Sequence, residues 1–75
     1  MHPAQSRGGR GLLAWSQGQL AKAAGVSLST VRDFEAGRRN PIANNMAAIR
    51  AALEAAGVIL IDENDQGAGV RLRKA

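Results

Sequence analysis

The side chains best suited to chemistry lie in the middle of the chain, on a short predicted helix that follows Ser27. At about 100° per residue, Val31 and Phe34 predict the buried face of this helix. The opposite face then carries Ser29, Arg32, Asp33 and Ala36, with Leu28 at its edge near the N-terminus of the helix. An arginine can bond the edge of guanine, an aspartate can accept from the N4 amine of cytosine, and a leucine can touch a thymine methyl.

Each of these side chains also has a simpler interpretation. Arg32 contacts either a base edge or only a phosphate. Asp33 reads a base, orients Arg32, or discourages wrong sequences by its charge. Ser29 either contacts a base or is merely solvated. These residue types therefore favour a helix face that contacts base edges, but they do not decide the role of each side chain.

A basic loop, Arg38-Arg39-Asn40, follows this helix just before Pro41. The whole chain holds 10 Lys and Arg against 6 Asp and Glu, a formal net charge of +4, which suits a polyanionic partner. The alternative for the two arginines is a solvated turn. Single-stranded nucleic acid is bound by exposed aromatic side chains. The two aromatic residues, Trp15 and Phe34, are both expected in packing, so duplex nucleic acid is favoured.

Other kinds of chemistry find no support in the sequence. The chain has no cysteine and one histidine, which excludes disulfide scaffolds, zinc ribbons and cysteine catalysis. A G-x-G-x-x-A pattern at residues 9–14 follows no strand, and the acidic run at 62–67 lacks the closing glutamate of a calcium loop. We therefore expect no enzyme activity, no cofactor and no metal. Because neither a signal peptide nor a membrane span is apparent, we expect a soluble, cytoplasmic protein.

Capping signals divide the first half of the chain into three helices. The first is predicted over residues 3–14, although Gly8, Gly9 and Gly11 argue against it. Ser16 and Gln19 form a capping-box pattern that starts the second helix. That helix runs to about residue 24, and glycine 25 ends it. Serine 27 caps the third helix, which glycine 37 ends.

The second half combines one helix with two strands. An apolar stripe of Met46, Ile49, Leu53 and Ala56 predicts a helix over 44–56, with Asn44 and Asn45 as candidate caps rather than ligands of a partner. Residues 58–61 are apolar and β-branched, and 70–73 alternate with period two. With a polar turn at 62–68 between them, these segments predict a β-hairpin.

The run from Trp15 to Pro41, with its Ser-Gln, Leu-Ala, Gly-Val-Ser, Thr-Val and Phe-Glu-Ala-Gly pairs, resembles the Cro/phage-repressor (XRE-like) helix-turn-helix family. The resemblance covers residues 10–56. It implies a mainly α, lambda-repressor-like bundle of four helices, here with a C-terminal two-stranded β-hairpin. We expect one DNA-binding domain over 1–75, with a helical unit at 3–57, the helix-turn-helix at 17–36 and the hairpin at 58–74.

The resemblance also assigns roles. The third helix enters the major groove by its N-terminal part, which makes the base-reading candidates Leu28, Ser29, Arg32 and Asp33. The family's phosphate-binding positions correspond to Gln17 and the loop Arg38-Arg39-Asn40, and the hydroxyls of Ser27 and Thr30 lie near the next phosphate. The family commonly pairs an arginine of the first helix with a glutamate of the third, which predicts an ion pair between Arg10 and Glu35.

The expected function is a sequence-specific double-stranded DNA-binding regulator, a repressor that acts as a homodimer. The surplus of apolar residues after the helix-turn-helix suggests a dimer through the hairpin, the fourth helix, or both, although the hairpin can instead pack within one chain. The alternative is an antitoxin or adaptor module that uses this fold to bind a protein. An interface with a protein would expose large apolar residues on the reading face, where the sequence offers only Leu28.

Overall fold

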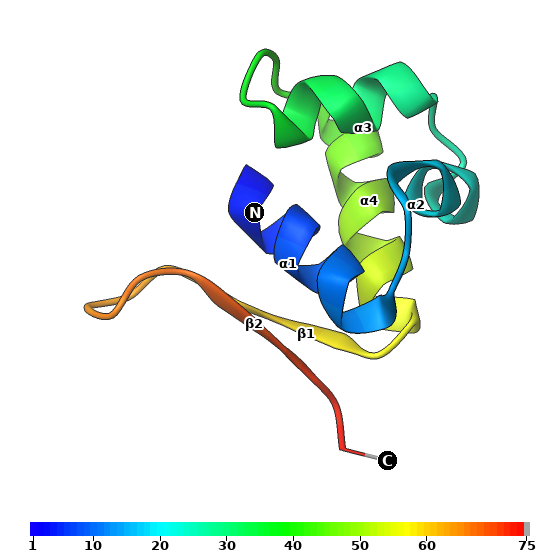
Figure 1. Cartoon of the computed structure of the whole chain (residues 1–75). Coiled ribbons are helices and arrows are strands. Elements are labelled where there is room, and N and C mark those ends of the chain that lie inside the picture. Colours follow the sequence, from blue (N-terminus) through cyan, green and yellow to red (C-terminus); the bar gives the residue numbers. More distant parts are fainter. Residues whose placement is uncertain (75) are drawn as a thin grey trace.

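The computed structural model describes residues 1–74 and consists of four helices followed by a two-stranded antiparallel hairpin (Figure 1). The elements are α1 (Pro3–Leu13), α2 (Gln17–Ala24), α3 (Leu28–Glu35), α4 (Ala43–Ala55), β1 (Val58–Ile61) and β2 (Gly69–Leu72). The mainly α architecture of a lambda-repressor-like helix-turn-helix bundle with a C-terminal hairpin is therefore confirmed.

Local signals set the ends of α2 and α3. The Ser16 hydroxyl accepts from the backbone N–H of Gln19 at 3.0 Å, and the Gln19 amide oxygen accepts from the Ser16 N–H at 2.7 Å. This is the predicted capping box. Gly25 ends α2 at φ 68°, a left-handed conformation that strains other residues. The turn that brings α3 across α2 is thus fixed by residues within one short stretch of sequence.

The start of α4 differs from the prediction. The N-cap residue is Ile42, whose side chain has no group to accept a backbone hydrogen bond, and the helix begins at Ala43. Asn44 and Asn45 lie inside the first turn and do not cap the helix, so their assignment as caps is wrong. Pro41 explains the shift, because it favours an extended residue before it and leaves the chain free to turn helical soon afterwards.

The core lies where α2, α3 and α4 meet and continues under the hairpin. Its fully buried side chains come from every one of these elements: Leu20, Val31, Phe34, Ile49, Leu53 and Val58. Trp15 is half-buried against this cluster, as expected of a packing residue at the start of α2. The apolar stripe of α4 therefore serves both the helix-turn-helix and β1.

The glycines of α1 allow the helix to approach its neighbours closely. A Cβ at Gly8 would lie 3.0 Å from the Val70 side chain, and one at Gly9 would lie 3.3 Å from Leu53. A Cβ at Gly11 would meet nothing within 4 Å. Gly8 and Gly9 lower the helix propensity of α1, but they allow it to pack closely against β2 and α4. The burial gained by this packing outweighs the cost of glycine in a helix.

The hairpin packs on α1 as well as on α4. β1 and β2 pair in the register Val58–Leu72 to Ile61–Gly69. The amide nitrogen of buried Gln5 donates to the carbonyls of Ile61, at 2.8 Å, and Gly69, at 3.0 Å. One side chain of the first helix therefore holds both strands at the turn end of the hairpin.

Candidate nucleic-acid interface

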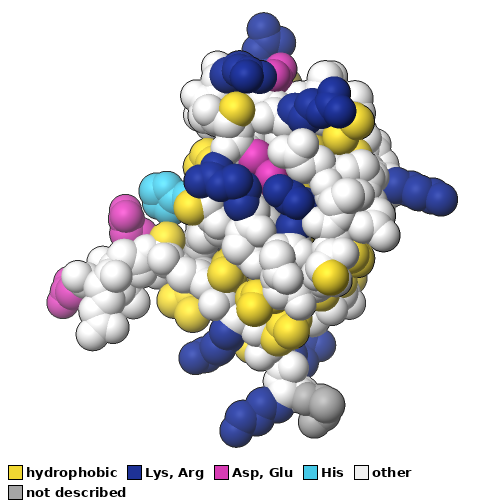
Figure 2. All heavy atoms as spheres, in the orientation of Figure 1, with side chains coloured by type: hydrophobic (Ala, Val, Ile, Leu, Met, Phe, Trp, Pro, Cys, Tyr) yellow, Lys and Arg dark blue, Asp and Glu magenta, His cyan; other side chains and the backbone are white. Residues whose placement is uncertain are grey.

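The outward face of α3 is polar and open. Ser29 and Arg32 are exposed, and the Asp33 side chain is 39% exposed. Figure 2 shows Lys and Arg side chains gathered around α3 and the loop after it, with an acidic side chain among them. This surface has hydrogen-bonding groups on a rigid helix with cationic groups at its border, which is the arrangement that a groove of duplex DNA requires.

The loop after α3 folds back onto Asp33. The backbone N–H groups of Arg38 and Arg39 donate to the Asp33 carbonyl at 2.9 and 3.4 Å. The carboxylate of Asp33 pairs with the Arg38 guanidinium at 3.6 Å. Of the alternatives open for Asp33, orientation of an arginine is thus observed, but the arginine is Arg38 of the loop rather than Arg32.

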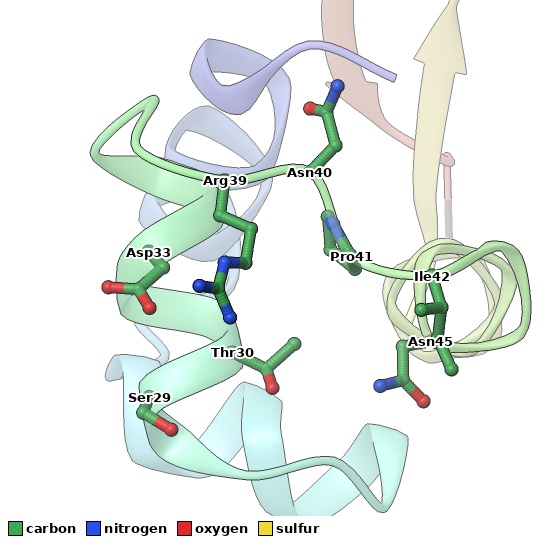
Figure 3. Close-up of a pocket in the computed structure, with 8 residues that line it drawn as sticks. All are labelled: Ser29, Thr30, Asp33, Arg39, Asn40, Pro41, Ile42 and Asn45. Atoms are coloured by element: carbon green, nitrogen blue, oxygen red, sulfur yellow. The ribbon is translucent and has the colours of Figure 1, made fainter.

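A groove of about 240 Å³ separates α3 from the start of α4. Figure 3 shows Arg39 reaching along α3 toward Thr30, with Ile42 and Asn45 on the opposite wall. Neither Ile42 nor Asn45 was expected at this surface from the sequence. The sequence signal for Ile42 is its place directly after Pro41, just before the start of α4, where its side chain is exposed.

Ser27 and Thr30 already hydrogen-bond at the start of α3. The Ser27 hydroxyl accepts from the Thr30 N–H at 3.1 Å and lies 2.7 Å from the Thr30 hydroxyl. Ser27 is therefore the N-cap of α3, as predicted. Any phosphate contact by these hydroxyls would add to this capping role.

Gln17 is the first residue of α2, and its side chain turns toward the interior. Its amide nitrogen donates to the Glu35 carboxylate at 3.1 Å. An amide nitrogen carries two hydrogens, so this bond leaves one donor free for a phosphate. The orientation of the predicted phosphate-binding amide is thus set by a buried carboxylate.

Glu35 is buried, with 3% of its surface exposed, and accepts hydrogen bonds from three side chains. Arg10 binds it through two nitrogens, with the shortest distance 2.7 Å, and the Ser6 hydroxyl donates at 2.5 Å. Burial alone would raise the pKa of Glu35, but the hydrogen bonds from Arg10, Ser6 and Gln17 bring it below its ordinary value. The same pair raises the pKa of Arg10.

This network reaches further than the single pair expected from the sequence. Arg10 also donates to the Trp15 carbonyl at 3.0 Å, and Arg7 donates to the Glu35 carbonyl. Ser6 and Arg7 were not anticipated, although they lie four and three residues before Arg10 and so share its side of α1. The network ties α1 to both helices of the helix-turn-helix.

Leu28 differs from its expected exposure. It is half-buried and packs against the core, whereas Ile42 is 70% exposed. The expectation that Leu28 is the one large apolar side chain available at this surface is therefore wrong. Leu28 packs against the core in the first turn of α3, whereas Ile42, the N-cap of α4, lies in solvent.

Comparison with known families gives a match over residues 9–57, to the helix-turn-helix family HTH_3. That range spans well over half of the chain and includes α2, α3 and, from the buried network, Arg10, Gln17 and Glu35. The chain belongs to this family. HTH_3 proteins are DNA-binding regulators of the Cro/C1 (XRE-like) type, and the family is not one of enzymes. No curated protein matches the chain closely enough to be a relative.

The matched range contains α2, α3 and α4, while the hairpin lies outside it. Within residues 1–74, no helix has the length and apolar character needed to cross a membrane.

Proposed function

We propose that the chain is a repressor that binds a near-palindromic operator as a homodimer. α3 lies in the major groove and reads bases with Leu28, Ser29, Arg32 and Asp33. Gln17, Ser27, Thr30 and the loop Arg38-Arg39-Asn40 hold the phosphates on either side. The single observation that carries this proposal is the exposed polar face of α3, with arginines of the following loop folded back beside it.

The geometry refines the division between reading and anchoring. Arg32 is exposed and has no partner among the ion pairs of residues 1–74, so its guanidinium is free to bond a base edge. Asp33 pairs with Arg38, so its first role is to hold the loop. Gln17 anchors a phosphate with the amide hydrogen that Glu35 leaves free. Two such domains would read half-sites about 34 Å apart on one side of the duplex.

The experiment that tests this proposal is selection of bound sequences from random duplex DNA, followed by affinity measurements against salt. We expect one enriched motif with two related halves, and an affinity that falls steeply with salt as phosphate contacts release counterions. Binding without sequence preference would overturn the proposal.

An adaptor or antitoxin that binds a protein is the second candidate function, and exposed Ile42 is the observation in its favour. An apolar side chain at the border of the groove suits a protein surface as well as a deoxyribose. Ile42→Ser separates the two: a DNA-binding regulator keeps its selected motif, whereas a protein-binding module loses its partner. An Ala47→Ser variant, changed at an exposed position within α4, is the control.

A further inference from the structure

The two-stranded sheet has an outer edge on each strand, and within residues 1–74 the outer edge of β2 pairs with no other strand. β1 alternates between buried and half-buried residues, whereas β2 passes from half-buried to exposed, so β2 is the more open strand. The backbone N–H of Arg73 donates to the Gly57 carbonyl at 2.8 Å, so the backbone hydrogen-bonding groups of Arg73 point toward the β1 side of the hairpin. Because backbone groups alternate along a strand, those of Val70 and Leu72 point to the outer side.

Opposite charges mark the two ends of the hairpin. The turn carries Asp62, Glu63 and Asp65, whereas the far end carries Arg71, Arg73 and Lys74. Figure 1 shows the turn reaching away from the helices, and Figure 2 shows acidic side chains at that end and basic side chains at the other. A second hairpin running antiparallel to this one would place each acidic end beside a basic end.

An apolar side chain borders the same edge. Leu72 is 44% exposed. Gly8 faces Val70, and Leu72 lies two residues further along the same strand face. A partner strand at this edge would lie beside Leu72 and reduce its exposure.

We propose that two copies of this chain pair through the outer edges of β2 and form a continuous four-stranded antiparallel sheet. The inference deepens the homodimer of the proposed function by naming its surface. A register that sets Val70 opposite Val70 of the partner subunit bonds the outward-pointing groups of both strands. It also sets Arg73 opposite the partner's Gly67, within the turn. A register centred on Arg71 is excluded because it places like charges directly opposite each other.

Charge reversal tests the pairing. Arg73→Glu with Lys74→Glu gives a hairpin that is acidic at both ends, and Glu63→Lys with Asp65→Lys gives one that is basic at both ends. We expect each variant to dimerise at least about tenfold more weakly than the parent, because favourable contacts at both ends become repulsive. An equal mixture of the two variants should recover dimerisation as a heterodimer. Sedimentation equilibrium measures all three.

Two outcomes of that experiment would overturn the proposal: variants that dimerise as the parent does, or a mixture that stays monomeric. Circular dichroism and thermal unfolding of each variant check that the monomer remains folded. Binding to a half-site duplex separates this proposal from the proposed function. Variants that bind the half-site like the parent but lose the gain from the second half-site support β2 pairing. A parent that dimerises through β2 yet selects no DNA motif contradicts the proposed function alone.

Amide hydrogen exchange provides a test without substitutions. In the dimer the N–H groups of Val70 and Leu72 are bonded to the partner, whereas that of Arg71 is bonded within the hairpin at any concentration. On dilution below the dimer dissociation constant, exchange at Val70 and Leu72 should accelerate while that at Arg71 does not. Equal acceleration at all three positions would contradict edge pairing.

Discussion

Helix α3 carries two acidic residues, Asp33 and Glu35, and each forms an ion pair with an arginine. The Asp33–Arg38 pair spans 3.6 Å, and its side chains are 39% and 72% exposed. The Glu35–Arg10 pair spans 2.7 Å, and its side chains are 1% and 18% exposed. In the buried pair, Glu35 also accepts hydrogen bonds from Ser6 and Gln17. In the exposed pair, water and any approaching phosphate can compete with Asp33 for Arg38. Burial therefore commits the Glu35 pair to holding the fold, whereas solvent exposure leaves the Asp33 pair accessible to other charged groups.

Substitution of Glu35 and of Asp33 by alanine should give the largest difference in the free energy of unfolding. Glu35→Ala leaves Arg10 charged and without its carboxylate in a largely buried position, so we expect a loss of about 3–5 kcal/mol in the free energy of unfolding. Asp33→Ala should change it by no more than about 0.5 kcal/mol. Urea unfolding followed by circular dichroism measures both. Similar losses for the two variants would show that burial does not separate the pairs.

Acid should weaken the buried pair. The pKa of Glu35 is lowered in the folded protein from its ordinary value of 4.5, so the native state binds this proton less tightly than the unfolded state. The contribution of Glu35 to stability is therefore fully present above the ordinary pKa and is lost as pH falls through the lowered one. Urea unfolding between pH 6 and pH 3 should show this loss, and Glu35→Gln, as the matched control, should show less of it. Parallel pH profiles would contradict the assignment.

Alanine substitutions of Arg39 and Arg32 should weaken DNA binding in different ways. Arg39→Ala should weaken binding to every sequence and reduce the slope of log affinity against log salt by about 1. Arg32→Ala should cost about 1–3 kcal/mol at one base position and relax preference there. Affinity for the selected motif and for its single-base variants, measured at several salt concentrations, distinguishes them. Uniform losses for Arg32→Ala would make it a phosphate contact.

Exposed and buried positions of α1 should also differ, with a smaller effect on stability. Gly11→Ala places a methyl group in open space, so we expect the helix propensity of alanine to stabilise the protein by about 0.5–1 kcal/mol. Gly9→Ala places the same group 3.3 Å from Leu53, so most or all of that gain should be offset by crowding. Thermal unfolding of both variants gives the comparison. An equal gain at the two positions would show that the approach of α1 to α4 is not tight.

Sequence alone predicts much of this fold, because its signals are local. The capping box at Ser16, the left-handed Gly25 and the N-cap at Ser27 each act within a few residues. The register of periodic apolar residues then identifies the buried faces. The start of α4 was missed because its N-cap, Ile42, has no capping side chain and so gives no local signal of a helix start.

The candidate site is less predictable because its contacts join distant segments. The outward face of α3 follows from helical periodicity, but the turn of Gln17 toward Glu35 depends on how α2 crosses α3. The groove beside Ile42 depends on the path of the loop, which periodicity does not describe. Likewise, the need for glycine at positions 8 and 9 depends on how β2 and α4 lie against α1.

The Gln5 amide has a consequence for the order of folding. Its bonds to Ile61 and Gly69 span 56 and 64 positions of the chain, so the loops that they close are among the longest in the molecule. Contacts of such separation form late, because the entropy of loop closure must be overcome before they stabilise anything. During synthesis, α2 and α3 can meet early, whereas the hairpin cannot dock on α1 until residue 69 has emerged. The packing of α3 on α2 therefore precedes the docking of β2 on α1.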